Sequence, residues 1–155
     1  MSKSFMTVKL GEYLFGMDVS VVREVNRSVD MTPVALAPEL IRGLMNLRGQ
    51  IITVLDPAIR LSLGPCKITN TTRCVVLKTK TEGSYLGLRD ITGVLVDSVG
   101  DIVNVEPDEI ETTPPNVGDI NDQFIESVVK LDKDLLIVLN MSKILEPVNQ
   151  IRDQH

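Results

Sequence analysis

The chain has 155 residues, 43% of them hydrophobic and 24% charged, and its formal net charge is −5. A chain of this length can bury about 70% of its unfolded surface in a single domain. Only 3% of the residues are aromatic, and an acidic chain with so few rings is poorly suited to stack on bases or to neutralise phosphates. The composition therefore argues against nucleic-acid binding.

Export, membrane insertion and metal binding have no clear signal in this sequence. The opening segment "MSKSFMTVKLGEYLFGMDV" lacks a continuous apolar run and a small-residue cleavage pattern. No window approaches 18 apolar residues, so we expect no membrane insertion. Cys66 and Cys74 are eight residues apart, which is not a familiar metal-site spacing, so we expect two unpaired thiols in a reducing cytosol. We predict a cytoplasmic protein.

Short runs of β-branched and alternating apolar residues dominate the chain, which is typical of strands separated by turns. No long amphipathic helix occurs, so we predict a mostly-β fold of short strands. The predicted strands are residues 5–10, 13–17, 44–47, 50–56, 73–80, 92–105 with a break at Gly100, and two within 124–140.

Short helices and two connections complete the predicted elements. The helices are predicted at 18–25, where Asp18 can act as N-cap, at 38–41, at 57–63 and at 141–151. Residues 64–72 form a predicted linker, and residues 106–122 a long acidic connection that contains prolines.

An internal repeat emerges when residues 41–61 are aligned without gaps to residues 125–145. Apolar positions, the turn position and a polar residue before a short helix, Asp56 or Asn140, coincide. Identical residues occupy the aligned pairs 41/125, 47/131, 54/138, 55/139 and 61/145. We interpret the chain as two related β units that divide near residue 70.

Catalytic groups are scarce in this sequence. The single histidine is His155, the last residue, which argues against Ser-His-Asp, Cys-His and His-metal chemistry. No Gly-rich phosphate loop occurs. A cation site in the acidic run at 106–111, or a carboxylate enzyme that uses Asp97 and this run, is an alternative, but a solvated loop and a strand-end acceptor are the simpler interpretations.

The turn "LRGQ" at residues 47–50 raises a question of its own. The second copy of the repeat has "LDKD" at this place, so the architecture does not require Arg48. Gly49 supplies the positive φ that a tight turn needs. For Arg48 three roles stay open: a solvated side chain, an intramolecular salt bridge, or a contact with another protein.

Four segments, "YLFGMDVSVVREV", "IRGLMNLRGQIITVLD", "GVLVDSVGDIV" and "LLIVLNMSKIL", resemble the CheW family of bacterial chemotaxis coupling proteins in order and spacing. The resemblance covers residues 5–146. Its most specific parts are the Asn-Leu-Arg-Gly motif before an apolar strand that ends in Asp, and the motif "VDSVGDI". It implies that residues 1–155 form a single domain of two five-stranded, SH3-like β-barrel subdomains on a common core, with a few short helices.

The resemblance also implies a function. It implies a non-catalytic adaptor, without a cofactor, that couples chemoreceptor cytoplasmic tips to the regulatory domain of the histidine kinase CheA and can take part in rings. The receptor tip is expected in an apolar groove between the two units. A scaffold in another chemosensory pathway, such as pilus-driven motility, is the alternative.

Matched to the family's motifs, the residues expected to take part in partner binding are Val22, Glu24, Gly43, Asn46, Arg48, Gly49, Val75, Gly93, Asp97 and Ile102. Each also has a plainer interpretation. The glycines can be backbone necessities, the aliphatic side chains can be core, and Asp97 can be a local acceptor. The stretch at 79–93 is longer than a minimal hairpin needs and predicts an extended loop that affects partner choice.

Overall fold

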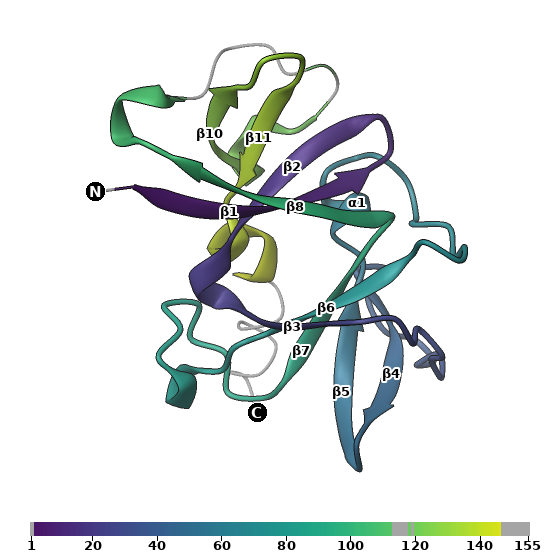
Figure 1. Cartoon of the computed structure of the whole chain (residues 1–155). Coiled ribbons are helices and arrows are strands. Elements are labelled where there is room, and N and C mark those ends of the chain that lie inside the picture. Colours follow the sequence, from purple (N-terminus) through teal and green to yellow (C-terminus); the bar gives the residue numbers. More distant parts are fainter. Residues whose placement is uncertain (1, 113–117, 119, 147–155) are drawn as a thin grey trace.

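A computed structural model describes residues 2–112, 118 and 120–146 of the chain. Its strands form two sheets, with the order β8-β1-β2-β11-β10-β9 in the six-stranded sheet and β3-β6-β7-β5-β4 in the five-stranded sheet (Figure 1). The strands are β1 (Lys3–Leu10), β2 (Tyr13–Asp18), β3 (Val22–Asn26), β4 (Ile41–Leu47), β5 (Gln50–Leu55), β6 (Arg73–Leu77), β7 (Thr92–Val96), β8 (Ser98–Val105), β9 (Ile110–Thr112), β10 (Ile125–Lys130) and β11 (Leu135–Leu139).

The predicted fold class, mostly β with two sheets and a few short helices, is confirmed. One sheet has six strands where the family resemblance implied five, because the three-residue β9 pairs with β10. The helices are α1 (Pro57–Arg60), a helix at 141–146, and the 3-10 helices η1 (Val19–Val21), η2 (Lys80–Glu82), η3 (Pro107–Glu109) and η4 (Asp122–Phe124).

The predicted helix at 18–25 is largely wrong. Asp18 does act as an N-cap, since its Oδ1 accepts a hydrogen bond of 2.9 Å from the Ser20 N–H. The helix is only the single 3-10 turn η1, and the chain then continues as β3, paired antiparallel to β6. The run "VVREV" fits the residue spacing of a helix as well as that of a strand. Its pairing with the buried strand β6 stabilises the β structure.

Two other local predictions also need correction. Residues 38–41 form a turn instead of a helix, closed by a bond of 2.9 Å from the Ile41 N–H to the Pro38 carbonyl. Gly100 does not end its strand, because β8 runs from Ser98 to Val105, but the pairing of β8 with β1 has a bulge at Gly100 and Asp101. The interruption falls at Asp97, between β7 and β8, where the chain passes from one sheet to the other.

The sequence repeat has a structural counterpart. In both copies an antiparallel hairpin, β4–β5 or β10–β11, leads into a short helix. A bulge occurs at the same aligned place, between residues 41 and 43 and between 125 and 127. The second strand of each hairpin then pairs in parallel with a strand from elsewhere, β5 with β7 and β11 with β2.

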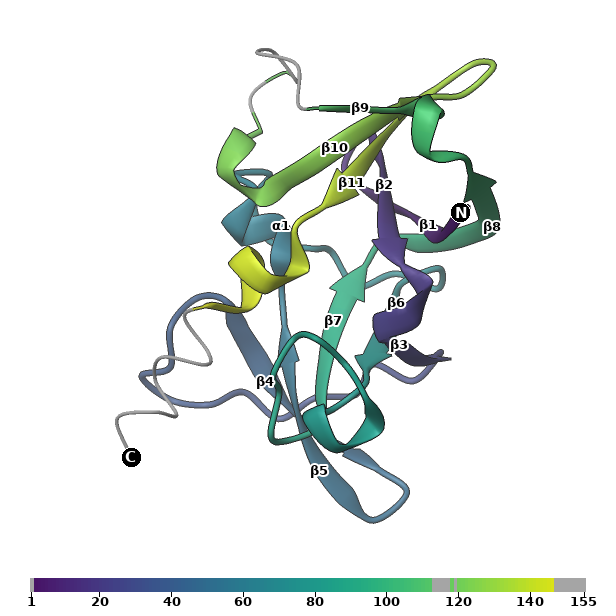
Figure 2. The same ribbon diagram turned by 90° about the vertical axis from the view of Figure 1, so that its left-hand side faces the viewer.

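The sheets do not divide near residue 70 as predicted. Strands β1 and β2 from the first half join β8 to β11 in one sheet, and β3 to β5 join β6 and β7 in the other. After β2 the chain crosses to the five-stranded sheet as β3, and after β7 it crosses back as β8. Each half of the sequence therefore contributes to both sheets, which lie one above the other in Figure 2.

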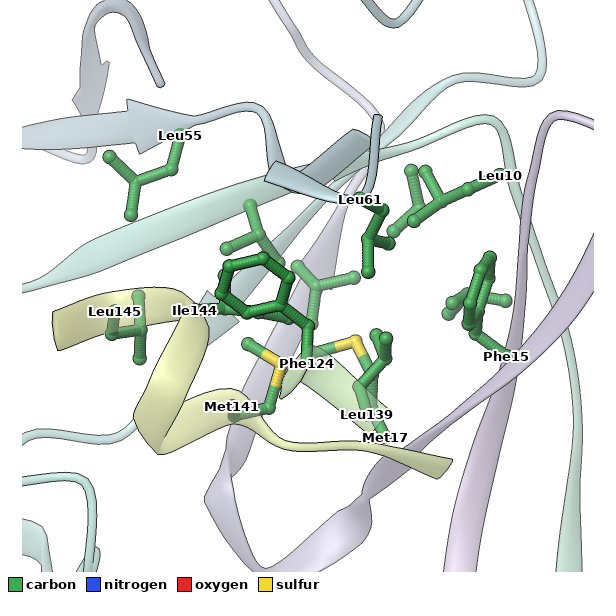
Figure 3. Close-up of a cluster of buried hydrophobic side chains, with 14 of the residues drawn as sticks. Leu10, Phe15, Met17, Leu55, Leu61, Phe124, Leu139, Met141, Ile144 and Leu145 are labelled. Atoms are coloured by element: carbon green, nitrogen blue, oxygen red, sulfur yellow. The ribbon is translucent and has the colours of Figure 1, made fainter. Parts of the chain in front are cut away.

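The main hydrophobic core is shared by the two sheets (Figure 3). Leu10 and Phe15 come from the six-stranded sheet, Leu55 from the other, and Ile144 and Leu145 from the C-terminal helix. Burial of each such side chain contributes about 1.5–3 kcal/mol to folding. Two smaller buried clusters lie within the individual sheets, so the sheets are packed on a common core, as the resemblance implied.

Candidate partner-binding site

The Asn-Leu-Arg-Gly motif forms the turn between β4 and β5. Leu47 pairs with Gln50, and the two residues between them, Arg48 and Gly49, have φ angles of 49° and 88°. Positive φ at both central positions is the signature of a type I′ hairpin turn. The Asn46 side chain stabilises the turn, because its Oδ1 accepts a bond of 2.9 Å from the Gly49 N–H. Asn46 and Gly49 thus have structural roles.

Arg48 reaches across to another strand. Its Nη2 lies 2.7 Å from Oε2 of Glu24, which lies on β3. Strands β3 and β4 are the two edges of the five-stranded sheet, so this ion pair bridges the edges and helps to close the sheet on itself. The Arg48 side chain is 67% exposed and the Glu24 side chain 29%. The structure therefore brings two predicted site residues together on the surface.

The ion pair shifts the acidity of both groups. The hydrogen bond from Arg48 is the main cause that lowers the pKa of Glu24, and the nearby Arg23 lowers it further. The same hydrogen bond raises the pKa of Arg48. Both groups therefore stay charged over the whole physiological pH range. A guanidinium has five N–H donors, and Glu24 is the sole carboxylate partner of Arg48 among the residues that the structure describes.

Gly43 has a steric role behind this turn. The segment after β3 folds back and pairs with β4 through two backbone hydrogen bonds between Thr32 and Leu44, of 2.8 and 2.9 Å. A Cβ on Gly43 would lie 2.7 Å from the Thr32 carbonyl oxygen. Glycine at this position therefore permits the second contact that closes the five-stranded sheet. The backbone interpretation of Gly43 is the one that the geometry supports.

Val75 and Gly93 lie inside the molecule. Val75 has no exposed surface and belongs to the main core. Gly93 is buried in β7, where a Cβ would clash with the Cys74 Sγ. Neither residue can touch a partner in this conformation, so we do not keep them as contact residues. Val22 is half-buried and packs against the main core.

Asp97 and Ile102 are not part of the Arg48 surface. Asp97 lies at the crossover between the sheets, where its Oδ2 accepts a bond of 2.8 Å from the Gly11 N–H. The prediction of a local acceptor is correct. Ile102 lies on β8, the edge of the six-stranded sheet, and is 58% exposed. It remains available for contact, on the sheet that does not carry Arg48.

Sequence reasoning missed the apolar residue that follows the turn. Ile51 on β5 is 63% exposed and lines a hollow of about 510 Å³. The other lining residues are Gln50, Thr53, Arg89, Asp90 and Ile91. Strand alternation could have found it, since Ile52 and Val54 point into the core and Ile51 must point outward. Its neighbours from the loop before β7 carry no signal of proximity in the sequence.

The carboxylates proposed for an enzyme are far apart. Asp97 directly precedes the eight-residue strand β8, and Glu109 lies beyond the other end of that strand, in η3. Glu109 also has a local structural role, because its Oε1 accepts a bond of 2.9 Å from the Glu106 N–H. In the described ranges no group of three or more His, Cys, Asp or Glu residues is arranged to hold a metal ion.

A family model described as the CheW-like domain matches residues 4–148. The chain belongs to the CheW family. The chemotaxis protein CheW of Bacillus subtilis is 30% identical over 133 residues, which are 85% of this chain and 80% of that protein. Protein FrzA of Myxococcus xanthus is 30% identical over 150 residues, which are 96% of this chain and 88% of that protein.

A solved CheW structure has the same fold. The crystal structure of the scaffolding protein TtCheW from Thermoanaerobacter tengcongensis matches with a TM-score of 0.78 at 30% identity, over 94% of this chain and 88% of that one. The chain is therefore a CheW-family scaffold of chemotaxis-type signalling. Within the described residues, no helix has the length and apolar character needed to cross a membrane.

Proposed function

We propose that this protein couples the cytoplasmic tips of chemoreceptors to the regulatory domain of the histidine kinase CheA, without catalysing a reaction. The observation that carries the proposal is the exposed Arg48–Glu24 pair, whose arginine belongs to the Asn-Leu-Arg-Gly motif. The protein acts in the cytoplasm, and at the membrane-associated receptor array through its partners. It needs no cofactor in this role.

Arg48 is built to orient a partner. The type I′ turn holds its backbone, and Glu24 holds one edge of the guanidinium at 2.7 Å. Fixing the side chain beforehand lowers the entropy that binding must remove. The remaining N–H donors can then form a charge-assisted, bidentate contact with a carboxylate on the partner. Glu24 therefore positions Arg48, and Arg48 makes the contact.

A receptor tip is a helical hairpin, and such a helix docks by its apolar ridge. We place it at the junction of the two sheets, where Val22 begins β3 and lies half-buried on the common core. The kinase domain resembles the adaptor, so the two can alternate in a ring through related surfaces. Ile51 and Ile102 are the exposed apolar side chains that we assign to these contacts.

Coupling then works without chemistry. Each contact is modest, and the array gains its strength from many linked contacts. A receptor that changes its conformation shifts the population of kinase states through the bound adaptor. The proposal therefore requires that one protein molecule contacts the receptor and the kinase together.

A charge-swap cycle tests the role of the pair. We expect Arg48→Glu and Glu24→Arg each to weaken binding to a receptor-tip fragment or to the kinase regulatory domain by about tenfold or more in calorimetric titration. The double swap restores the internal pair but moves the arginine to β3. It should therefore recover folding stability more fully than affinity.

A second surface pair supplies the matched control. Lys130 and Glu111 lie 3.8 Å apart on the six-stranded sheet, with side chains 75% and 53% exposed. Swapping these two charges should leave both affinities unchanged. Affinities at the wild-type level in Arg48→Glu, with wild-type binding intact, would contradict the contact role of Arg48.

The same fold fits a scaffold in another chemosensory pathway, such as one for pilus-driven motility. The similarity to protein FrzA, 30% identity over 96% of this chain, is as high as that to the Bacillus subtilis CheW. Binding to the receptor and kinase encoded beside this gene, in preference to those of a second chemosensory operon in the same genome, would decide between the pathways.

A further inference from the structure

The predicted linker at residues 64–72, which lies between α1 and β6, is held in place by hydrogen bonds to side chains. Residues 64–72 carry no helix or strand, and the chain enters them through positive φ angles at Ser62 and Gly64. The centre of the linker is Cys66, which is buried with 5% of its surface exposed. Its bonds run in two directions, one toward each sheet.

Toward the five-stranded sheet, Cys66 is held by an ion pair. Its N–H donates to Asp56 Oδ2 at 2.8 Å, and its carbonyl accepts from Arg42 Nη1 at 2.8 Å. Arg42 Nη1 and Asp56 Oδ2 are themselves 2.7 Å apart. Asp56 is fully buried at the start of α1, and Arg42 lies on β4. The linker is therefore fixed to the first repeat hairpin.

Toward the six-stranded sheet, the thiol of Cys66 contacts Asp97. The Sγ lies 3.1 Å from Asp97 Oδ1, while Asp97 Oδ2 accepts from the Gly11 N–H at 2.8 Å. The Asp97 N–H donates to the Lys9 carbonyl at 2.9 Å. Lys9 lies near the end of β1, close to the turn between β1 and β2. Asp97 therefore connects this turn to the linker. Thr71 adds a bond of 2.9 Å to the Asp97 carbonyl.

The protonation of the thiol suits this arrangement. Burial, with the hydrogen bond to Asp97 as the next cause, raises the pKa of Cys66 to about 12. The thiol therefore keeps its proton at neutral pH and acts as a donor to the carboxylate. Asp97 receives one donor on each oxygen, from residues 86 and 31 positions away in the chain.

We propose that Asp56, Cys66 and Asp97 form a polar network that fixes the orientation of the two sheets relative to each other. The network joins α1, the linker, the crossover and the β1–β2 turn. The partner-binding surfaces on the two sheets, at Arg48 and at Ile102, then keep a constant distance and orientation relative to each other. The network is a property of the free protein, so it stands or falls independently of the proposed partners.

The second cysteine provides an internal comparison. Cys74 is also buried, within β6, and lies among the apolar side chains of the five-stranded sheet. Within the described part of the chain its thiol has no hydrogen-bond partner, and its Sγ would overlap a Cβ on Gly93. A serine hydroxyl can therefore replace the thiol at position 66, where Asp97 can accept its hydrogen bond. At position 74 the hydroxyl would be buried without a hydrogen-bond partner.

Amide hydrogen exchange in the free protein tests the network. The Gly11 N–H donates to Asp97, and the Gly49 N–H donates to the Asn46 side chain at 2.9 Å, so Gly49 is a matched control. We expect Cys66→Ala and Asp97→Asn to speed exchange at Gly11 by about tenfold and to leave Gly49 unchanged. Cys66→Ser should restore the wild-type rate at Gly11, whereas Cys74→Ser should destabilise the whole protein.

The relative orientation of the two sheets is tested with a pair of spin labels, one on each sheet, attached at Ile51→Cys and Ile102→Cys. Both sites are exposed, and the distribution of distances between the two labels is measured. The distance distribution should broaden in Asp97→Asn and in Cys66→Ala, and stay narrow in Cys66→Ser. Unchanged Gly11 exchange and an unchanged distribution in Asp97→Asn would overturn the proposal. Equal acceleration at Gly11 and Gly49 would overturn it too, because it would indicate global loss of stability.

Discussion

Arg48 and Glu24 are 24 residues apart in the sequence, and they meet because the edges of the five-stranded sheet come together. The sequence predicted the turn and the positive φ at Gly49, since both depend on local chemistry. It did not predict the positive φ at Arg48 or its partner. The partner depends on where β3 lies, and the sequence of β3 itself fits a helix as well as a strand.

The pair has a pH dependence of known sign. Arg48 holds the pKa of Glu24 below its ordinary value of 4.5. A carboxyl whose folded pKa is depressed stabilises the fold above its unfolded pKa, and this contribution is lost as the pH falls through the folded pKa. We expect the Glu24 titration, followed by side-chain NMR, to have its midpoint below 4.5 and to move upward in Arg48→Ala. An identical midpoint in both proteins would contradict the ion pair.

Gly43 gives a second test at the scale of one residue. Alanine here would place its Cβ against the backbone oxygen of Thr32, which cannot move aside as a side chain can. We expect Gly43→Ala to lower the free energy of unfolding by about 1–3 kcal/mol, as measured in urea. Gly11→Ala is a contrasting variant, because the space there is open and the strain comes from φ alone. A neutral Gly43→Ala would show that the Thr32 segment does not close the sheet.

Among the elements, the repeated hairpin was the part most readily predicted. Alternating apolar residues marked β4, β5, β10 and β11, and the polar residue after each hairpin marked a helix start. Sequence could not separate the roles of these two polar residues. Asn140 caps its helix through the Lys143 N–H at 3.1 Å, whereas Asp56 forms no cap and binds Arg42 and Cys66.

The two residues should therefore respond differently to alanine. We expect Asn140→Ala to cost about 1 kcal/mol of unfolding free energy, as for an ordinary N-cap. Asp56→Ala should cost about 2–3 kcal/mol, because it removes charge-assisted bonds from a fully buried carboxylate. Denaturant unfolding of both variants gives the comparison. Equal costs would mean that the bonds of Asp56 to Arg42 and Cys66 contribute no more stability than an ordinary helix cap.

At the scale of the whole molecule, the exchange of strands between the halves was beyond sequence reasoning. The repeat alignment suggested two consecutive units, but it contains no information on which sheet each strand joins. That choice is made by the crossovers after β2 and β7, where a few residues at Asp18 and Asp97 redirect the chain. The extended loop expected at 79–93 is also part of this assembly, since Leu86 and Leu88 enter the shared core.

Because each half of the sequence contributes strands to both sheets, neither half should fold when it is separated from the other. In residues 1–70 the strands β1, β2, β3 and β5 each lack one neighbouring strand, and in residues 71–155 so do β6, β7, β8 and β11. We expect neither fragment to show a cooperative thermal transition alone, because each leaves open sheet edges and half of the shared core exposed. A folded NMR spectrum from either fragment by itself would contradict the shared core.

The most direct test of the adaptor role is a three-component binding experiment with the wild-type protein. A receptor-tip fragment and the cognate kinase regulatory domain are titrated separately and then together, with complex size measured by light scattering. The account predicts that each partner binds and that all three form one complex. Binding to neither partner, or strict competition between the two for one site, would contradict it.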